Sequence, residues 1–379
     1  MIDTFRLKTK IYLNKESIQV LKELKGTHAL IICDKIMEKL GYLQKTIFYL
    51  EQAGMTSDVF TDIKPDPDVK VIADGMKAFK ESNADVLVAI GGGSAIDAAK
   101  GIMYCAWQID KGLGNEFKKP LFVAIPSTSG TGSEVTDFSV ITSGGEKLVL
   151  VDEFLAPDIA LLDSTCVVHV PQRVVVDTGL DVLVHAVEAY VSKNATDFTD
   201  AFAEKAIKII FKHLPKLYND VSDPKARDKV MNASCMAGIA FTNAGLGINH
   251  SLAHAFGGKY HISHGRSNAL LMCPVIEYNA ILSGNADNFA AHRYAKLAKL
   301  LGLSASTSKE GVINFIQAIQ NLQSSLGIES GIRGLNINKN DYESSLSAMA
   351  GTVLLDRCTP SNPRSPSKED IIGIYLKAF

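Results

Sequence analysis

The 379-residue sequence has few cysteines, and their positions form no recognisable framework. The six cysteines are scattered along the chain, and no C-x-x-C pair occurs. This pattern argues against a disulfide scaffold and against a zinc site built from thiolates. It fits a protein that works in a reducing compartment.

Long apolar runs and an excess of one charge are also missing. No run approaches the length that a membrane-spanning helix needs, and residues 1–14 lack the continuous apolar core of a signal peptide. The formal net charge is only -2, so electrostatics favours neither nucleic acid nor an anionic membrane as a partner. We therefore expect a soluble, cytoplasmic protein that acts on a small molecule.

Hydrophobic patterning divides the chain into two halves. Short apolar runs at 27–34, 85–90 and 120–126 alternate with helical patterns, which is typical of a parallel sheet in an α/β domain. Beyond residue 170 the apolar period is that of helices, predicted over the segments 171–192, 197–213, 227–244, 247–258 and 265–283. We predict an α/β domain over 1–170 and an all-α domain over 171–379, with a ligand cleft between them as the default expectation.

Two glycine-rich loops follow predicted strands of the first half. Gly91, Gly92, Gly93 and Ser94 come directly after a strand and open a helix, although their spacing is not that of G-x-G-x-x-G. Glycines allow close approach to a pyrophosphate, and the amides at the helix start attract its charge. A tight turn without a ligand is the plain alternative, and motif matches alone do not exclude it.

The second loop covers residues 126–134 and is mostly Ser, Thr and Gly, which suit a ribose or a phosphate. Two such loops after parallel strands favour a bound nucleotide over a flexible surface loop. Asp34 ends the first strand, where its carboxylate could bind an adenosine ribose and would repel a 2′-phosphate. The sequence therefore favours NAD over NADP.

The second half contains a concentration of possible metal ligands. Asp181 and His185 are four residues apart, as are His250 and His254, and His264 follows close behind. Residues four apart share a helix face. A local salt bridge or a hydrogen-bonded histidine is the alternative for each taken alone. Together they favour a site for Fe(II), Zn(II), Mn(II) or Co(II), because burying so many polar groups is costly without a ligand.

At this point the sequence resembles the iron-containing (group III) alcohol dehydrogenase family. The resemblance lies in G-G-G-S-x-x-D-x-x-K at 91–100, S-T-S-G-T-G-S-E-V-T at 127–136, G-L-D-V-L-V-H-A-x-E-A-Y at 179–190, G-L-G-I-N-H-S-L-A-H at 245–254, H-G at 264–265 and N-P-R at 362–364. These motifs are distributed over the chain with compatible spacing. The resemblance implies a dehydroquinate synthase-like architecture and a homodimer.

The resemblance also assigns roles to individual residues. The implied metal ligands are Asp181, His185, His250 and His264. The implied cofactor-binding residues are Asp34, Gly92, Gly93, Ser94, Asp97, Ser127, Thr128, Thr131, Val140 and Lys147. Ser127 replaces a threonine that is common in relatives and keeps its hydroxyl. Phe241 and Cys358 match positions that line the alcohol pocket, and His254 matches a histidine near the substrate that is not a ligand.

Within the family, the chain start D-T-F-R-L-K-T-K-I-Y and the segment I-K-P-D-P are most similar to the branch that serves propanediol-utilisation microcompartments. The ethanolamine-utilisation branch is a near neighbour. We therefore expect NAD(H)-dependent interconversion of a short primary alcohol, such as 1-propanol or ethanol, and its aldehyde. The metal would bind the substrate oxygen, and His254 would relay the proton. Localisation inside a microcompartment is a further expectation.

Three other functions fit parts of the pattern. A polyol dehydrogenase similar to the glycerol branch usually uses zinc and a different histidine arrangement. A dehydroquinate synthase-like lyase needs several basic residues for an anionic substrate, and Arg266 is the one arginine near the histidines. A sensor module would need a DNA-binding element or a regulatory tail, and neither is recognisable.

Overall fold

The computed structural model describes residues 4–144 and 146–379, apart from the side chains of residues 146 and 147. These residues form two compact units. One contains Arg6–Val170, and the other contains Pro171–Phe379 together with the described residues ahead of Arg6. Among the described residues, no helix is long and apolar enough to cross a membrane.

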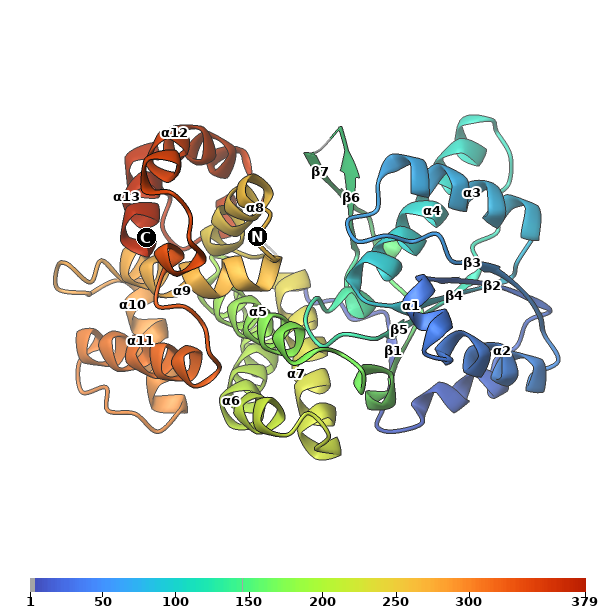
Figure 1. Cartoon of the computed structure of the whole chain (residues 1–379), viewed down its shortest axis with the longest axis horizontal. Helices are drawn as coiled ribbons and strands as arrows, with labels where there is room; N and C mark the ends of the chain where they lie inside the picture. The colour runs from blue at the N-terminus through green and yellow to red at the C-terminus, as the bar shows by residue number, and fades with distance from the viewer. Residues whose placement is uncertain (1–3, 145) are drawn as a thin grey trace. The chain divides into compact units, whose positions relative to one another are not determined.

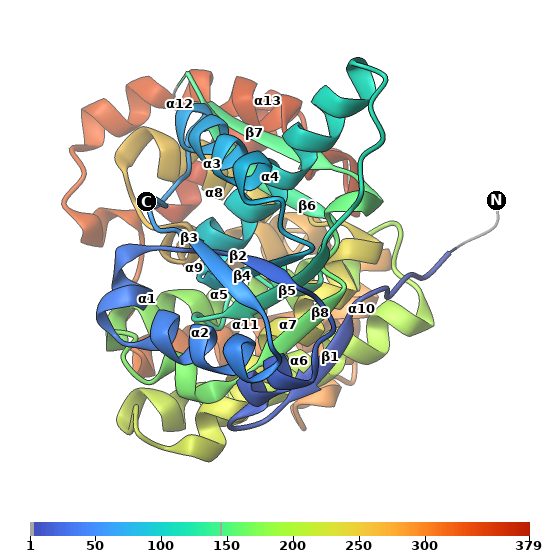
Figure 2. The same ribbon diagram turned by 90° about the vertical axis from the view of Figure 1, so that its right-hand side faces the viewer.

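A parallel sheet organises the α/β unit (Figures 1 and 2). Its six described strands lie in the order β1-β8-β5-β4-β2-β3, and every pair is parallel. The strands are β1 Lys10–Leu13, β2 His28–Cys33, β3 Thr56–Phe60, β4 Val86–Gly91, β5 Leu121–Pro126 and β8 Ile159–Leu162. This confirms the predicted fold class. Because β3 lies on one side of β2 and β4 on the other, the strand order reverses between β2 and β4, where α/β sheets bind ligands.

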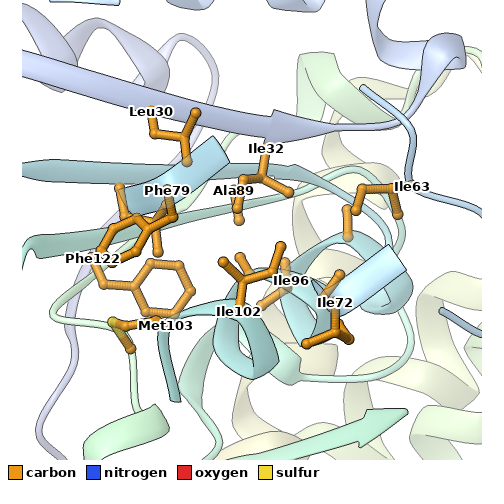
Figure 3. Packing of buried hydrophobic residues seen from close by; sticks show 14 of the residues in the cluster. Leu30, Ile32, Ile63, Ile72, Phe79, Ala89, Ile96, Ile102, Met103 and Phe122 are labelled. Carbon is orange, nitrogen blue, oxygen red and sulfur yellow. The ribbon is translucent and has the colours of Figure 1, made fainter. Parts of the chain in front are cut away.

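Two hydrophobic clusters cover the two faces of this sheet. Along β2, Leu30 and Ile32 belong to one cluster, whereas Ala29 and Ile31 belong to the other. This alternation follows from the two-residue period of a strand. Figure 3 shows the first cluster, in which α3 (Val69–Ser82) and α4 (Gly93–Gly112) pack against the sheet. Both faces are buried, so the strands are apolar throughout rather than alternating with polar residues.

The remaining elements of this unit are short helices and a hairpin. The helices α1 (Lys35–Lys39) and α2 (Tyr42–Gln52) follow β2. The antiparallel hairpin consists of β6 (Phe138–Ser143) and β7 (Glu146–Val151). The hairpin packs mainly against α4, which brings it next to the helix that begins at the first glycine-rich loop.

The second unit is helical. Its helices are α5 Gln172–Val191, α6 Asp197–Asn219, α7 Pro224–Ala244, α8 Ile248–Tyr260, α9 His264–Ala280, α10 Phe289–Leu300, α11 Ser308–Ser325, α12 Lys339–Leu355 and α13 Lys368–Ala378. Helix α5 is surrounded by α6, α7 and α9, and residues 179–191 are buried without a break. A helix buried on all sides must be apolar all round, so polar residues on it need a specific partner.

Candidate active site

Four of the predicted ligands converge in the helical unit. Asp181 and His185 lie on successive turns of α5, His250 lies in the first turn of α8, and His264 begins α9. One ligand atom from each lies within 4.8 Å of the other three. The structure therefore brings together all four residues that the resemblance implied.

The distances between these atoms suit a metal ion. Asp181 Oδ1 lies 3.8 Å from His250 Nε2 and 3.7 Å from His264 Nε2, and Asp181 Oδ2 lies 4.0 Å from His185 Nδ1. These separations are longer than hydrogen bonds. Ligand atoms that each bind one ion at about 2.0–2.2 Å lie roughly 3–4 Å from one another. The spacing therefore fits four groups around a common centre better than a set of direct ion pairs.

Burial gives a second test of the fit. Asp181, His185 and His250 are only 3%, 4% and 1% exposed. Burial raises the pKa of Asp181, and burial together with the charges of His264 and His254 lowers the pKa of His250. His250 is therefore neutral, which is the form that ligates metals. Its buried Nε2 has no hydrogen-bond partner among the described residues, as expected for an atom that binds something else.

Glu188 orients His250, and the sequence analysis assigned it no role. Its Oε2 lies 2.5 Å from His250 Nδ1, and its Oε1 accepts a hydrogen bond from the Asn249 amide at 2.7 Å. Burial raises the pKa of Glu188 to about 8. A metal-binding histidine usually donates its other ring N–H to such a group, which fixes the ring. Glu188 stands seven residues after Asp181, on the same face of α5, so helical periodicity could have identified it.

Two asparagines support Asp181 in a similar way. Asn268 Nδ2 donates to Asp181 Oδ1 at 2.7 Å, and Asn249 Nδ2 donates to Asn268 Oδ1 at 2.8 Å. Gly247 lies beside this network, where an added Cβ would come within 2.7 Å of Glu188 Oε1. The polar groups around the four ligands are thus hydrogen-bonded to one another and tightly packed.

The other residues predicted near the substrate lie beside the four ligands. The ring of Phe241 stacks on His185 with a centroid distance of 4.5 Å. The ring of His254 stacks on His264 at 5.3 Å, and its Nδ1 lies 2.8 Å from Asp356 Oδ2. Cys358 follows Asp356 in the chain, and burial raises the pKa of its thiol well above the usual range. The thiol therefore stays protonated and serves as a small apolar group rather than a nucleophile.

The first glycine-rich loop opens α4 as predicted. Gly92 is the N-cap residue of α4, Gly93 is its first residue, and Ser94 lies in its first turn. Gly92 has no side chain with which to cap this helix, so, within the part of the chain that the structure describes, the N-cap residue leaves the helix start open to an anionic ligand. This arrangement fits the pyrophosphate of a dinucleotide.

The second loop packs directly against the first. Ser127 N donates to Gly91 O at 2.8 Å. An added Cβ on Gly93 would come within 2.8 Å of Thr131, and one on Gly92 within 3.4 Å of Thr128. At position 93 only glycine allows this approach, whereas at position 92 the added Cβ would make an ordinary contact. The two loops thus form one surface at the carboxyl ends of β4 and β5.

Asp34 lies at the neighbouring strand end. Its Oδ1 accepts hydrogen bonds from the amides of Ile36 and Met37 at the start of α1. Its Oδ2 lies 3.9 Å from the position of a Cβ on Gly91, which places the carboxylate next to the first loop. A carboxylate beside the end of β2 is the arrangement that binds a ribose hydroxyl in dinucleotide-binding folds.

Two predicted cofactor residues bind each other. Asp97 Oδ2 accepts a hydrogen bond from Val140 N at 3.1 Å, so α4 holds the β6 strand at this point. The side chain of Lys147 lies outside the described residues, and its backbone belongs to β7. The contact between Asp97 and Val140 places the hairpin beside the helix that the first loop opens.

Lys100 is the last residue of the motif at 91–100, and no role was predicted for it. It is 0% exposed, and its Nζ donates to Thr136 O, Thr136 Oγ1 and Phe138 O at 2.8–2.9 Å. Burial lowers its pKa to about 8, and burial raises the pKa of nearby Glu134 to about 7. These hydrogen bonds attach the segment that directly follows the second loop to α4.

Comparison with known proteins identifies the family. The model for iron-containing alcohol dehydrogenases matches residues 8–164, and the C-terminal model of the same family matches residues 175–379. The chain therefore belongs to the iron-containing alcohol dehydrogenase family.

Individual relatives agree with this assignment. A 1-propanol dehydrogenase (PduQ) of Salmonella typhimurium is 40% identical over 98% of both chains. An aldehyde-alcohol dehydrogenase of Entamoeba histolytica is 37% identical over 99% of this chain and 46% of that protein. The chain thus spans about half the length of the bifunctional relatives that it matches.

Solved structures show the same fold over the whole chain. A 1,3-propanediol oxidoreductase has a TM-score of 0.91 at 32% identity and is covered completely. An iron-containing alcohol dehydrogenase from Thermococcus thioreducens has a TM-score of 0.89 at 34% identity, with 99% of each chain covered.

Proposed function

We propose that this protein is a metal-dependent alcohol dehydrogenase that interconverts a short primary alcohol and its aldehyde with NAD(H). The observation that carries the proposal is the convergence of Asp181, His185, His250 and His264 within one buried site. The two glycine-rich loops of the α/β unit, which fit a dinucleotide, also support the proposal. The family and its alcohol dehydrogenase relatives point to the same reaction.

The four ligands would hold a divalent ion, and we propose Fe(II), with Zn(II) as the alternative. When bound, such an ion supplies Lewis-acid stabilisation for the charge that develops on a substrate oxygen. A bound nicotinamide coenzyme would supply the hydride chemistry, and the part of this chain would be to align the coenzyme with the substrate carbon. The amides at Gly92 and Gly93 would bind the pyrophosphate, and His254 would accept the alcohol proton in oxidation and return it in reduction.

A short alkyl substrate is supported by the surroundings of the four ligands. The ring of Phe241 stacks on His185, the protonated thiol of Cys358 lies near His254, and both offer apolar surface. Relatives named as acting on 1-propanol and on butanol support the same substrate class. A diol is the second candidate, because the fold matches a 1,3-propanediol oxidoreductase over its full length.

The structure counts against a lyase that acts on an anionic substrate. Arg266 is 5% exposed and pairs with Asp177 at 2.8 Å and with Glu329 at 2.7 Å. Its charge is therefore already neutralised. An anionic substrate would need a free cation in its place.

For the coenzyme we propose NAD rather than NADP, because Asp34 would repel a 2′-phosphate at the end of β2. One relative, from Clostridium saccharobutylicum, is an NADPH-dependent butanol dehydrogenase at 36% identity, so the choice needs a direct test. From the family resemblance described under the sequence analysis we also propose a cytoplasmic homodimer that can associate with a bacterial microcompartment.

The experiment is a coenzyme assay on protein purified without oxygen and reloaded with a single metal. We expect Fe(II)-loaded protein to consume NADH with propionaldehyde or acetaldehyde, and to prefer NADH over NADPH. Metal-free protein should be inactive. The proposal would be refuted if no aldehyde or ketone supported NADH consumption, or if the metal-free protein were fully active. Faster turnover of glycerol or propanediol than of 1-propanol would favour a diol as the substrate.

A further inference from the structure

The sequence analysis gave Asp356 no role, but it lies in the same unit as the four ligands. It is the C-cap residue of α12 and precedes Cys358 by two positions. Its Oδ2 lies 2.8 Å from Nδ1 of His254, and its side chain is 15% exposed. The hydrogen bond joins residues that are 102 positions apart in the sequence, so only the folded chain brings them together.

Both oxygens of Asp356 are occupied. Oδ1 accepts from the amide of Cys358 at 2.8 Å and from the hydroxyl of Ser251 at 3.1 Å, while Oδ2 faces His254. A backbone N–H can only donate, so the atom on the Oδ1 side must be an acceptor. The orientation of the carboxylate is therefore fixed independently of His254.

The carboxylate in turn decides where the proton of His254 sits. Burial would raise the pKa of Asp356, but the hydrogen bonds from His254, the Cys358 amide and the Ser251 hydroxyl outweigh it and lower the pKa below its usual range. An ionised carboxylate only accepts hydrogen bonds, so Nδ1 of His254 must carry a proton. In the neutral imidazole, Nε2 is then the nitrogen with a free lone pair.

The ring of His254 lies beside the metal ligands. Its centroid is 5.3 Å from that of His264, with 16° between the planes, and 6.2 Å from that of His250. His254 is partly exposed, with 32% of its side chain accessible, whereas His250 is 1% exposed. It is thus a histidine next to the proposed ligands that solvent or a substrate can reach.

We propose that Asp356 is a positioning residue that holds His254 in the tautomer protonated at Nδ1, which leaves Nε2 to exchange a proton with the substrate hydroxyl. This inference rests on the proposed dehydrogenase function. In alcohol oxidation the carbon–hydrogen bond delivers its hydride to NAD, the oxygen–hydrogen bond gives its proton to Nε2, and the carbon–oxygen bond becomes a carbonyl. Nε2 later releases the proton to solvent, so His254 returns to its starting state.

Asp356→Asn tests the proposal because it keeps the size of the side chain and removes one acceptor. The Cys358 amide requires the remaining oxygen on the Oδ1 side, so the new NH₂ group faces His254. Nδ1 must then accept a hydrogen bond, and the proton moves to Nε2. A tautomer that is wrong for proton transfer loses most of the contribution of a general base, which is about 10²–10⁴-fold.

We expect Asp356→Asn to lower kcat by about 10²-fold with little change in KM, metal content or coenzyme affinity. Asp356→Glu, which keeps both acceptor oxygens, should recover part of the loss. In a His254→Ala background, Asp356→Asn should cost nothing further, because the two residues act as one unit. Equal losses from Asp356→Asn in both backgrounds would show a merely structural link and overturn the proposal.

A direct readout of the tautomer separates this inference from the proposed function. In protein labelled with ¹⁵N-histidine, Asp356→Asn should exchange the chemical-shift pattern of Nδ1 and Nε2 of His254, whether or not the protein oxidises alcohols. An unchanged pattern would refute the positioning role. A wild type that does not oxidise alcohols would refute only the proposed function.

A metal ion is the competing occupant of this cluster. Side-chain atoms of His254, Asp356 and Cys358 lie within 4.8 Å of one another. We expect one tightly bound ion per chain after loading with Fe(II) or Zn(II), and the same number in Asp356→Ala. Two ions in the wild type and one in Asp356→Ala would assign the cluster to a second metal and overturn the proposal.

Discussion

The two candidate binding regions are built in different ways. In the helical unit, the site consists of side chains from α5, α8 and α9, and the ligands depend on a second layer that includes Glu188 and Asn268. In the α/β unit, the site consists mainly of backbone, because the glycines of the first loop pack against the threonines of the second. Side-chain chelation depends on the chemical identity of each residue. A backbone cradle depends instead on the absence of side chains.

The largest effect should come from removing a ligand. His250→Ala deletes one of four groups around the ion, and losing the Lewis acid costs several kcal/mol, or about 10³-fold or more in turnover. Metal analysis and steady-state kinetics measure both consequences. The matched control is His292→Ala, since His292 is exposed on α10 and forms an ion pair with the exposed Asp287. Retention of full metal content in His250→Ala would show that the four residues do not form one site.

A smaller effect should follow from weakening the support of that ligand. Glu188→Gln keeps the shape of the side chain but replaces the carboxylate that faces His250 Nδ1. Changes to such supporting groups lower metal affinity by about 10–100-fold. Competition with a chelator measures the affinity, and Glu343→Gln on the exposed face of α12 is the control. The affinity for the coenzyme should not change. An equal loss of affinity for the metal ion and for the coenzyme would contradict the separation of the two regions.

The backbone-built region should respond to an added methyl group. Gly93→Ala places a Cβ 2.8 Å from Thr131 and forces the two loops apart, which we expect to weaken NADH binding about 10-fold. Fluorescence titration with NADH measures this. Gly112→Ala lies on the same helix, where an added Cβ would meet no described atom within 4 Å, and this variant should bind NADH normally. Adding Thr131→Ser to Gly93→Ala should restore part of the affinity, whereas unchanged binding in Gly93→Ala would refute the role of this loop.

The last prediction concerns stability rather than function, and its dependence on pH in the same region. Burial raises the pKa of Glu134 from 4.5 to about 7, so the folded state holds this proton more tightly than the unfolded state does. Stability from this group is complete below pH 4.5 and is lost as the pH rises to about 7. Relative to wild type, Glu134→Gln should therefore gain stability across this window, by at most about 3 kcal/mol.

Urea unfolding below and above this window measures the gain. Glu116 is exposed in the same unit, so the free energy of unfolding of Glu116→Gln should differ from that of the wild type by the same amount at each pH. A gain in Glu134→Gln that does not grow with pH would contradict the role of burial.

Element type was predictable wherever a segment was long or fully buried. The run at 85–90 became β4, and the segment predicted at 171–192 became α5, within a residue at each end. The segment 197–213 was predicted too short, because α6 continues past Pro215 to Asn219. Proline removes one hydrogen bond, but Leu214 and Leu217 are buried and hold the last turns in the core.

Short strands escaped the sequence analysis. The strands β1 and β8 have four residues each, which is too few to show a period, and they are recognisable only through their pairing. The hairpin β6–β7 is half-buried and lies between two turn-rich segments. Its place became clear only from its contacts with α4, including the bond between Asp97 and Val140.

The α/β and all-α halves and the two glycine-rich loops were predictable from the sequence alone, because hydrophobic period and local composition are visible along the chain. Spacing also indicated a group of possible metal ligands, and the family resemblance selected the four proposed ones among them. The side chains that support the predicted site residues became apparent only in the tertiary structure. Glu188 facing His250, Asn268 facing Asp181 and Asp356 facing His254 join separate helices. Helical periodicity can place Glu188 on the face of Asp181, but the partner that each of these side chains meets depends on the packing of distant segments, which one sequence does not reveal.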